Sequence, residues 1–213
     1  MSYQSSINYP HNVIFAHGFE GRPDGRKASY LRETLGMTVI SPTLHSKGWR
    51  FLDHVSVLAE ALDSNPDVSL VIGSSMGGLA SVVALSNRPS NAYKLILLAP
   101  AFGVHQSFRN RLGDAAFSKW AADGFIQYQH AAVGGPIDLP FSFWTECRDA
   151  ARIVIEASTV IIHGVHDDVI PLSESVSAAN RSPGVLSLFQ ADDDHRLGGS
   201  LDLIRDALTV LYA

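Results

Sequence analysis

The chain has 213 residues, of which 46% are hydrophobic and 17% are charged, and its formal net charge is -5. This length and composition are typical of one globular domain and exclude a disordered chain, so we expect a single domain over residues 1–213. No run of Lys or Arg exceeds two residues, which argues against a nucleic-acid or membrane-surface partner.

Cysteine content and terminal sequence point to the compartment. Cys147 is the only cysteine, which excludes an internal disulfide framework and a cysteine-ligated metal site. The amino-terminal MSYQSSINYP lacks the basic start and apolar core of a signal peptide, and no stretch approaches the roughly 18 apolar residues of a membrane span. We therefore expect a cytoplasmic protein.

Short apolar runs alternate with longer amphipathic segments along the chain. The short runs are rich in Val, Ile and Leu, as in strands covered on both faces, and lie at 12–16, 38–41, 68–72, 95–99, 160–163 and 185–189. Helices are predicted at 26–35, 50–62, 76–87, 147–156, 172–180 and 199–211. This alternation predicts a doubly wound α/β fold with a mainly parallel sheet of about six strands.

Residues 101–145 interrupt the alternation. The segment contains no clear strand and is rich in aromatic residues. We expect a small cap-like insertion above the carboxyl edge of the sheet, where open α/β sheets bind ligands. Four of its aromatic residues are predicted to line an apolar substrate site: Phe108, Trp120, Phe125 and Trp144. The alternative is a satellite hydrophobic cluster beneath a long loop.

The stretch VIGSSMGGLA, residues 71–80, contains a GxSxG motif centred on Ser75. Centring the motif on Ser74 would require glycines at positions 72 and 76, which the sequence does not have. An apolar run precedes the motif and a helical pattern follows it, the context in which a sharp turn exposes a nucleophilic serine. Ser75 is therefore the candidate nucleophile. The alternative is that these small residues only cap a helix.

A serine nucleophile requires a base and a carboxylate that orients the base. In folds with this motif the acid and then the histidine follow the serine, each on a loop after a later strand. His195, in QADDDHRLGG after the last predicted strand, is the predicted base. HGVHDDVIP, residues 163–171, places Asp167 and Asp168 on the preceding loop, and position alone does not choose between them.

Acyl transfer also requires donors for a developing oxyanion. One is predicted to be the backbone amide of Met76, directly after the nucleophile. The other is predicted in FAHGFE, residues 15–20, where Gly18 allows close approach and Phe19 offers its amide. The alternative is a turn of purely structural use.

The motifs HGFEGRPDGRKA, GSSMGG, HGVHDDVIP and DDDHRL together resemble the α/β-hydrolase superfamily, and within it the compact bacterial esterases of the YqiA-like type and related small thioesterases. The resemblance extends over essentially the whole chain. It implies Asp167 as the acid, beside Ser75 and His195. Two features depart from the larger relatives: the chain begins at what is usually the third strand, and the insertion is shorter than a full lid domain.

The resemblance also implies an activity. It implies hydrolysis of small-molecule carboxylic esters or thioesters with small to medium acyl groups, without a metal or organic cofactor, by a monomer or small homo-oligomer. The same triad also serves peptidases, perhydrolases and lyases, and a catalytically silent ligand-binding protein could use the same scaffold. Those alternatives stay open at the level of sequence.

Overall fold

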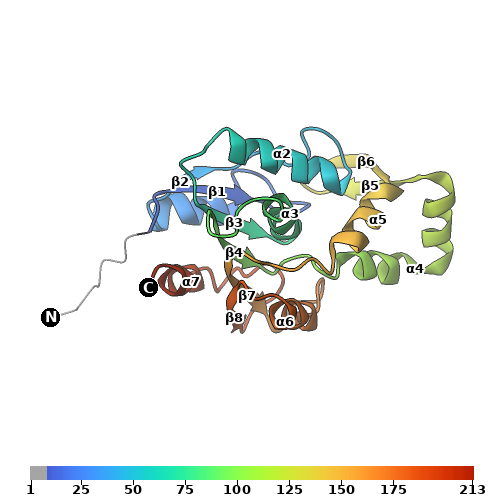
Figure 1. Ribbon diagram of the computed structural model, residues 1–213. Helices are drawn as coiled ribbons and strands as arrows, with labels where there is room; N and C mark the ends of the chain where they lie inside the picture. The colour runs from blue at the N-terminus through green and yellow to red at the C-terminus, as the bar shows by residue number, and fades with distance from the viewer. Residues whose placement is uncertain (1–8) are drawn as a thin grey trace.

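A six-stranded parallel sheet forms the centre of residues 9–213, the part of the chain that this computed structural model describes (Figure 1). Its strands are β1 (Asn12–Ala16), β2 (Thr38–Ile40), β3 (Leu70–Ser74), β4 (Lys94–Leu98), β7 (Ser158–Gly164) and β8 (Val185–Ala191). They lie in the order β2-β1-β3-β4-β7-β8, and every pair is parallel. The prediction of a doubly wound α/β sheet is confirmed.

Helices cover both faces of the sheet, which explains why its strands are apolar throughout. One face packs against α2 (Phe51–Asp63), α3 (Met76–Leu85) and α6 (Leu172–Arg181). The other face packs against α1 (Arg26–Ser29), the π-helical turn η1 (Tyr30–Thr34) and α7 (Leu203–Tyr212). Successive strand residues point to opposite faces, so Ile14 and Val71 belong to the first core and Val13 and Leu70 to the second.

The direction of winding reverses between β1 and β3. The chain passes from β1 to β2 on one side, and β3 then pairs with the other side of β1. At the carboxyl ends of two such strands the following loops diverge and leave a crevice between them. Open α/β sheets bind ligands in this crevice. The loop after β1 and the turn after β3 therefore frame the expected site.

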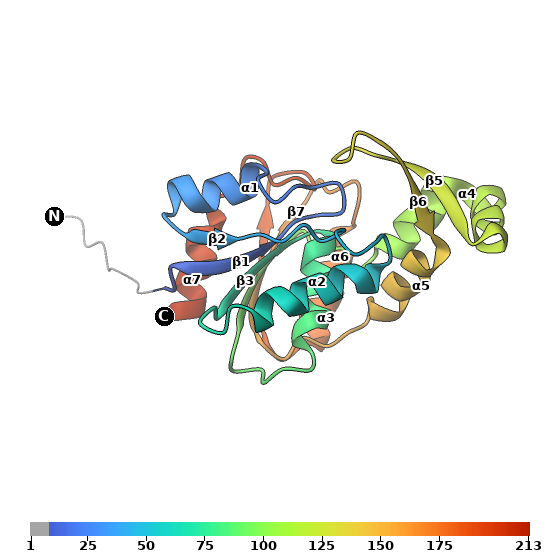
Figure 2. The same ribbon diagram turned by 90° about the horizontal axis from the view of Figure 1, so that it is seen from above.

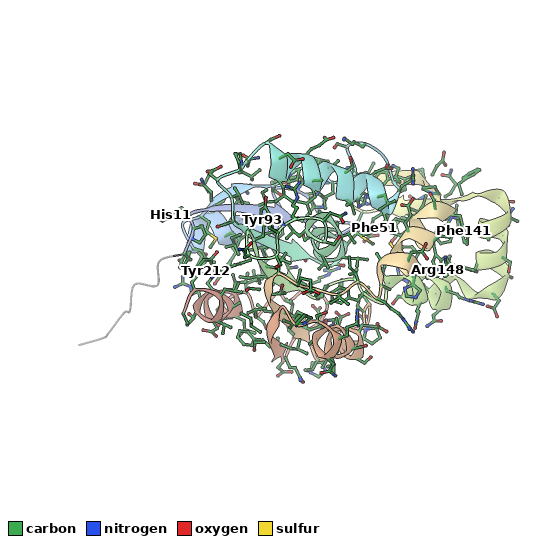
Figure 3. The ribbon with its side chains drawn as sticks, viewed as in Figure 1. His11, Phe51, Tyr93, Phe141, Arg148 and Tyr212 are labelled. Carbon is green, nitrogen blue, oxygen red and sulfur yellow. The ribbon has the colours of Figure 1, made fainter. Side chains whose placement is uncertain are left out.

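Between β4 and β7 the chain forms α4 (Val104–Asp123), β5 (Phe125–His130), β6 (Gly135–Pro140) and α5 (Phe141–Ala150). These elements lie together beyond one end of the sheet, and Phe141 and Arg148 mark α5 there (Figures 2 and 3). We refer to 104–150 as the cap segment. Helix α4 is interrupted at Gly113, whose φ of 72° and ψ of 165° are not helical.

Two predictions about secondary structure were wrong in this region. The sequence showed no clear strand in 101–145, but β5 and β6 form an antiparallel hairpin. Its strands are short and half-buried, and their polar residues conceal the apolar signal. The helix predicted over 147–156 is α5, which begins after Pro140 and ends at Ala150. Within residues 9–213, every helix is too short or too polar to span a bilayer.

Candidate active site

Ser75 occupies a strained turn between β3 and α3. Its φ of 52° and ψ of -116° lie outside the regions that L-residues normally adopt. Two flanking glycines allow this turn. A Cβ at Gly73 would lie 2.7 Å from the Cα of Gly78, and a Cβ at Gly77 would overlap the carbonyl oxygen of Ala16. The motif therefore folds into a tight strand-to-helix turn that leaves Ser75 partly exposed.

Three distant side chains meet at this turn. Nε2 of His195 lies 2.9 Å from Oγ of Ser75, and Nδ1 of His195 lies 2.7 Å from Oδ2 of Asp167. Asp167 follows β7 and His195 follows β8, and the pairing of these strands brings the two loops together. Because the carboxylate only accepts, Nδ1 of His195 carries a proton and Nε2 of the neutral ring accepts from the Ser75 hydroxyl.

The Asp167 carboxylate is fully buried and held by several donors. Its Oδ1 accepts from the amides of Val169 at 2.9 Å and Ile170 at 2.7 Å. Burial alone would raise its pKa, but the hydrogen bonds from His163, His195 and the Ile170 amide outweigh burial and hold the pKa well below the ordinary value. Asp167 is thus ionised at neutral pH. Of the two aspartates that the sequence left open, the structure brings Asp167 to the histidine.

The neighbouring Asp168 is exposed and has no contact with His195 among the described residues. The amides of Val169 and Ile170 turn back onto the Asp167 carboxylate, and the chain then enters α6. This leaves the Asp168 side chain facing solvent.

The predicted oxyanion donors lie on the two segments nearest the serine. A Cβ at Gly18 would lie 3.4 Å from the Cβ of Ser75, so the loop after β1 passes directly beside Ser75. The amides of Phe19 and Met76 donate none of the turn, loop or cap hydrogen bonds of residues 9–213. Both amides are therefore available to an oxygen placed between this loop and the first turn of α3.

The Phe19 side chain joins this loop to the cap segment. Its ring centroid lies 6.0 Å from Trp49, 5.5 Å from Tyr128, 4.9 Å from His130 and 5.0 Å from Phe143. We call Phe19 and these four residues the Phe19 cluster. Sequence reasoning missed all four partners, because they lie 30 to 124 positions away and no local pattern links them to Phe19.

The four aromatic residues predicted to line a substrate site lie in different surroundings. Phe108 is buried and its ring lies 6.4 Å from that of Phe19. Trp120 and Trp144 are buried inside the cap segment, where their ring N–H groups donate to the carbonyls of Leu139 and His105. Phe125 is 50% exposed at the start of β5 and makes no ring contact with described residues.

These placements change the expected substrate contacts. Phe108 borders the Phe19 cluster, whereas Trp120 and Trp144 are satisfied structural residues of the cap segment and Phe125 faces outward. Residues 9–213 contain no group of three or more His, Cys, Asp or Glu side chains arranged to hold an ion. The chemistry that this arrangement supports is proton transfer and nucleophilic attack by an oxygen.

Comparisons with known proteins support the fold. The family model described as "Uncharacterised protein family (UPF0227)" matches residues 12–211. The rat (Rattus norvegicus) protein "Palmitoyl-protein thioesterase ABHD10, mitochondrial" is 24% identical over 225 residues, which cover 90% of this chain and 71% of that protein.

Solved structures share the architecture at low identity. Mouse alpha/beta hydrolase domain-containing protein 10 has a TM-score of 0.70 at 22% identity, with 93% of this chain and 87% of that chain covered. Est1E from Butyrivibrio proteoclasticus has a TM-score of 0.72 at 17% identity, covering 96% of this chain and 87% of that one. Since the family model spans nearly the whole chain, the protein belongs to the UPF0227 family and has the α/β-hydrolase fold.

Proposed function

We propose that this protein is a serine hydrolase that cleaves carboxylic esters or thioesters through an acyl-enzyme on Ser75. One observation carries the proposal: a continuous hydrogen-bonded chain from the Ser75 hydroxyl through His195 to the buried carboxylate of Asp167. A hydroxyl is a weak nucleophile at neutral pH, and this arrangement supplies the base that activates it. The relatives described above, a thioesterase and an α/β hydrolase, support the same class.

In the proposed acylation step each group has one role. Nε2 of His195 takes the hydroxyl proton as Oγ of Ser75 bonds to the acyl carbon, and the carbonyl electrons move onto oxygen. The amides of Phe19 and Met76 stabilise that oxyanion. When the tetrahedral intermediate collapses, its bond to the leaving oxygen or sulfur breaks, and His195 donates the proton to that atom.

Deacylation repeats the cycle with water. His195 takes a proton from a water molecule, whose oxygen attacks the acyl carbon, and the released Ser75 oxygen recovers the proton. Asp167 stays ionised throughout and stabilises the imidazolium that forms twice in each turnover. The low pKa of Asp167 suits this role, because a carboxylate that took the proton itself would leave His195 misoriented.

The Phe19 cluster is the proposed contact surface for the acyl group. Phe19, Trp49 and Tyr128 are partly exposed, and Phe19 directly follows the residue that lies beside Ser75. An apolar chain would therefore lose water-exposed surface as it packs against these rings. Phe108 is retained in this site from the sequence prediction, and Trp120, Phe125 and Trp144 are not.

Hydrolysis of p-nitrophenyl butyrate by purified variants tests the proposal. Ser75→Ala should abolish turnover and labelling by a fluorophosphonate probe, while Ser86→Ala, at the far end of α3, should keep both. Asp167→Asn should lower kcat by about a thousandfold or more, since the histidine loses its orienting charge, and exposed Asp168→Asn should not. Full activity of Ser75→Ala would reject the proposed nucleophile.

A further inference from the structure

A cavity of about 320 Å³ is lined by residues of the loops after β1 and β8 and by the last residue of β3. Its lining includes Ser74, Gly18 and Arg196, which are the chain neighbours of Ser75, Phe19 and His195. The cavity therefore borders three of the four segments that form the proposed catalytic site, all but the loop that carries Asp167. Nothing in the acylation scheme above uses it.

The cavity lies on the opposite side of the sheet from the Phe19 cluster. Its apolar floor contains Phe15 and Leu201, which belong to the core under α1 and α7. Phe19 and Phe143 instead belong to or pack against the core under α2 and α3. The catalytic serine thus separates an aromatic surface on one side from this cavity on the other.

None of the residues that line the cavity is acidic. Four of them carry cationic side chains, namely Arg22, Arg26, Lys27 and Arg196. This is a concentration of positive charge in a chain whose net charge is -5. None of the four takes part in the ion pairs of residues 9–213. Arg22 and Arg26 donate only to backbone carbonyls, those of Ala132 and Gly198.

Lys27 is the most confined of the four cations. Its side chain is half-buried and forms no hydrogen bond within the described chain. Burial lowers its pKa, and the neighbouring Arg26 and Arg196 lower it further, against an opposing effect of Asp194 and Asp193. An anion in the cavity would relieve this repulsion and replace lost solvation.

The nearby aspartates are already occupied by their own loop. Oδ2 of Asp193 accepts from the Gly199 amide at 2.8 Å and the Ser200 hydroxyl at 2.9 Å, and Oδ1 of Asp194 accepts from the Arg196 amide at 2.7 Å. They hold the loop that carries His195, and within residues 9–213 neither forms an ion pair with a cavity cation.

His17, which also lines the cavity, adds no charge. Its Nδ1–H donates to the Gly18 carbonyl at 2.8 Å, and its Nε2 accepts from the Leu44 amide at 3.3 Å. Burial lowers its pKa despite the hydrogen bond to Gly18, and the neighbouring His45 and His130 act in the same direction as burial. The imidazole is thus neutral, and the positive charge of the cavity comes from the arginines and the lysine.

We infer that this cavity binds an anionic oxyacid group, a carboxylate or a phosphate, carried by the alcohol or thiol that leaves from Ser75-bound substrate. The inference rests on the proposed function. The leaving atom must lie near His195, which protonates it, and the cavity is lined by Arg196 and Gly198 of the same loop. Guanidinium and ammonium groups form their strongest hydrogen bonds with such anions.

The test compares three acetyl esters that differ only at one substituent of a phenol leaving group. They are 4-acetoxybenzoate, 4-acetoxyphenyl phosphate and the neutral methyl 4-acetoxybenzoate. The measured quantity is the ratio of kcat/KM for each anionic ester to kcat/KM for the neutral one. Intrinsic differences in ester reactivity cancel when this ratio is compared between variants.

Lys27→Met and Arg196→Gln should each lower the ratio about tenfold for at least one anion, as expected for the loss of one charge-assisted hydrogen bond. The anionic ester whose ratio falls shows whether the cavity binds a carboxylate or a phosphate. Arg32→Gln removes an equal charge from an exposed side chain on η1 outside the cavity and should keep the wild-type ratio. An unchanged ratio in both cavity variants overturns the inference alone, whereas wild-type protein inactive on all three esters contradicts the proposed function as well.

Discussion

Nε2 of His163 lies 3.1 Å from Oδ2 of Asp167, the same oxygen that lies 2.7 Å from Nδ1 of His195. One carboxylate oxygen therefore faces two imidazoles, of which His163 is fully buried. The other nitrogen of His163 lies 2.7 Å from the Ser175 hydroxyl on α6. Nε2 of His163 also lies 2.9 Å from the Ile170 carbonyl, so Ser175 and Ile170 hold the ring that faces the acid.

Replacing His163 by leucine should lower the free energy of unfolding and should also make that free energy less dependent on pH. Because the pKa of Asp167 in the folded protein is depressed, its stabilising effect is present above the ordinary value of about 4 and is lost as pH falls through the folded-state pKa. His163→Leu raises the folded-state pKa, so the variant should lose less stability than wild type between about pH 5 and pH 2.

Urea unfolding at a series of pH values measures this difference. At pH 7 we expect His163→Leu to be less stable by about 1.5–3 kcal/mol, the range for a hydrogen bond to a charged group. His166→Leu is the matched control, because His166 is an exposed neighbour that pairs with Asp192. Equal pH dependence in His163→Leu and wild type would show that His163 does not hold the charge of Asp167.

The strained backbone at Ser75 predicts that glycine is more stable than alanine at this position. A residue at φ 52° and ψ -116° stores about 1–3 kcal/mol of strain, which glycine relieves because it has no Cβ. Ser75→Gly should therefore be more stable than Ser75→Ala by about 1 kcal/mol after the greater flexibility of glycine is discounted. Denaturant midpoints of these two variants test this, and a lower midpoint for the glycine variant would argue against stored strain.

Gly77 should tolerate no side chain. A Cβ at this position would overlap the carbonyl oxygens of Ala16 and His17 and would force α3 away from β1. We expect Gly77→Ala to be destabilised by several kcal/mol and to lose esterase activity, since Met76 and Ser75 shift with the helix. Gly135→Ala is the control, because nothing lies within 4 Å of a Cβ at Gly135. Thermal unfolding and turnover of the two variants give the comparison.

The sheet and the three side chains that meet at Ser75 could be predicted because their signals are local. A buried parallel strand is a short apolar run, and Ser75, Asp167 and His195 each follow such a run within a few residues. The approach of these loops then follows from topology, since parallel strands end at one edge of the sheet.

The cap segment could not be predicted in the same way, because its strands are covered on one side only. In β5 the residues alternate between outward and inward, which places Phe125 and Gln127 outside and Tyr128 and His130 inside. Aromatic content alone placed Phe125 among the residues expected to line the substrate site, whereas its side chain is 50% exposed. The alternation identifies the inward residues only once the segment is known to be a strand.

His130 is the inward residue of β5 that reaches the proposed oxyanion loop. The Val133 amide donates to its Nδ1, so Nε2 carries the proton and donates to the carbonyl of Phe19 at 2.8 Å. Tyr128 donates to Glu20 on the same loop at 2.6 Å. Burial, followed by the bond to Glu20, raises the pKa of Tyr128 to about 12, so its hydroxyl keeps its proton well above pH 10.

His130→Phe should release the Phe19 carbonyl and misplace the neighbouring amide. Because that amide is a proposed oxyanion donor, we expect kcat to fall about tenfold or more while KM changes little, a smaller loss than the hundredfold or more for a deleted donor. His130→Gln, which retains an N–H donor, should restore part of kcat. Steady-state kinetics on one ester decide the point: an equal loss in both variants, or a change confined to KM, would assign His130 a purely structural or substrate-binding role.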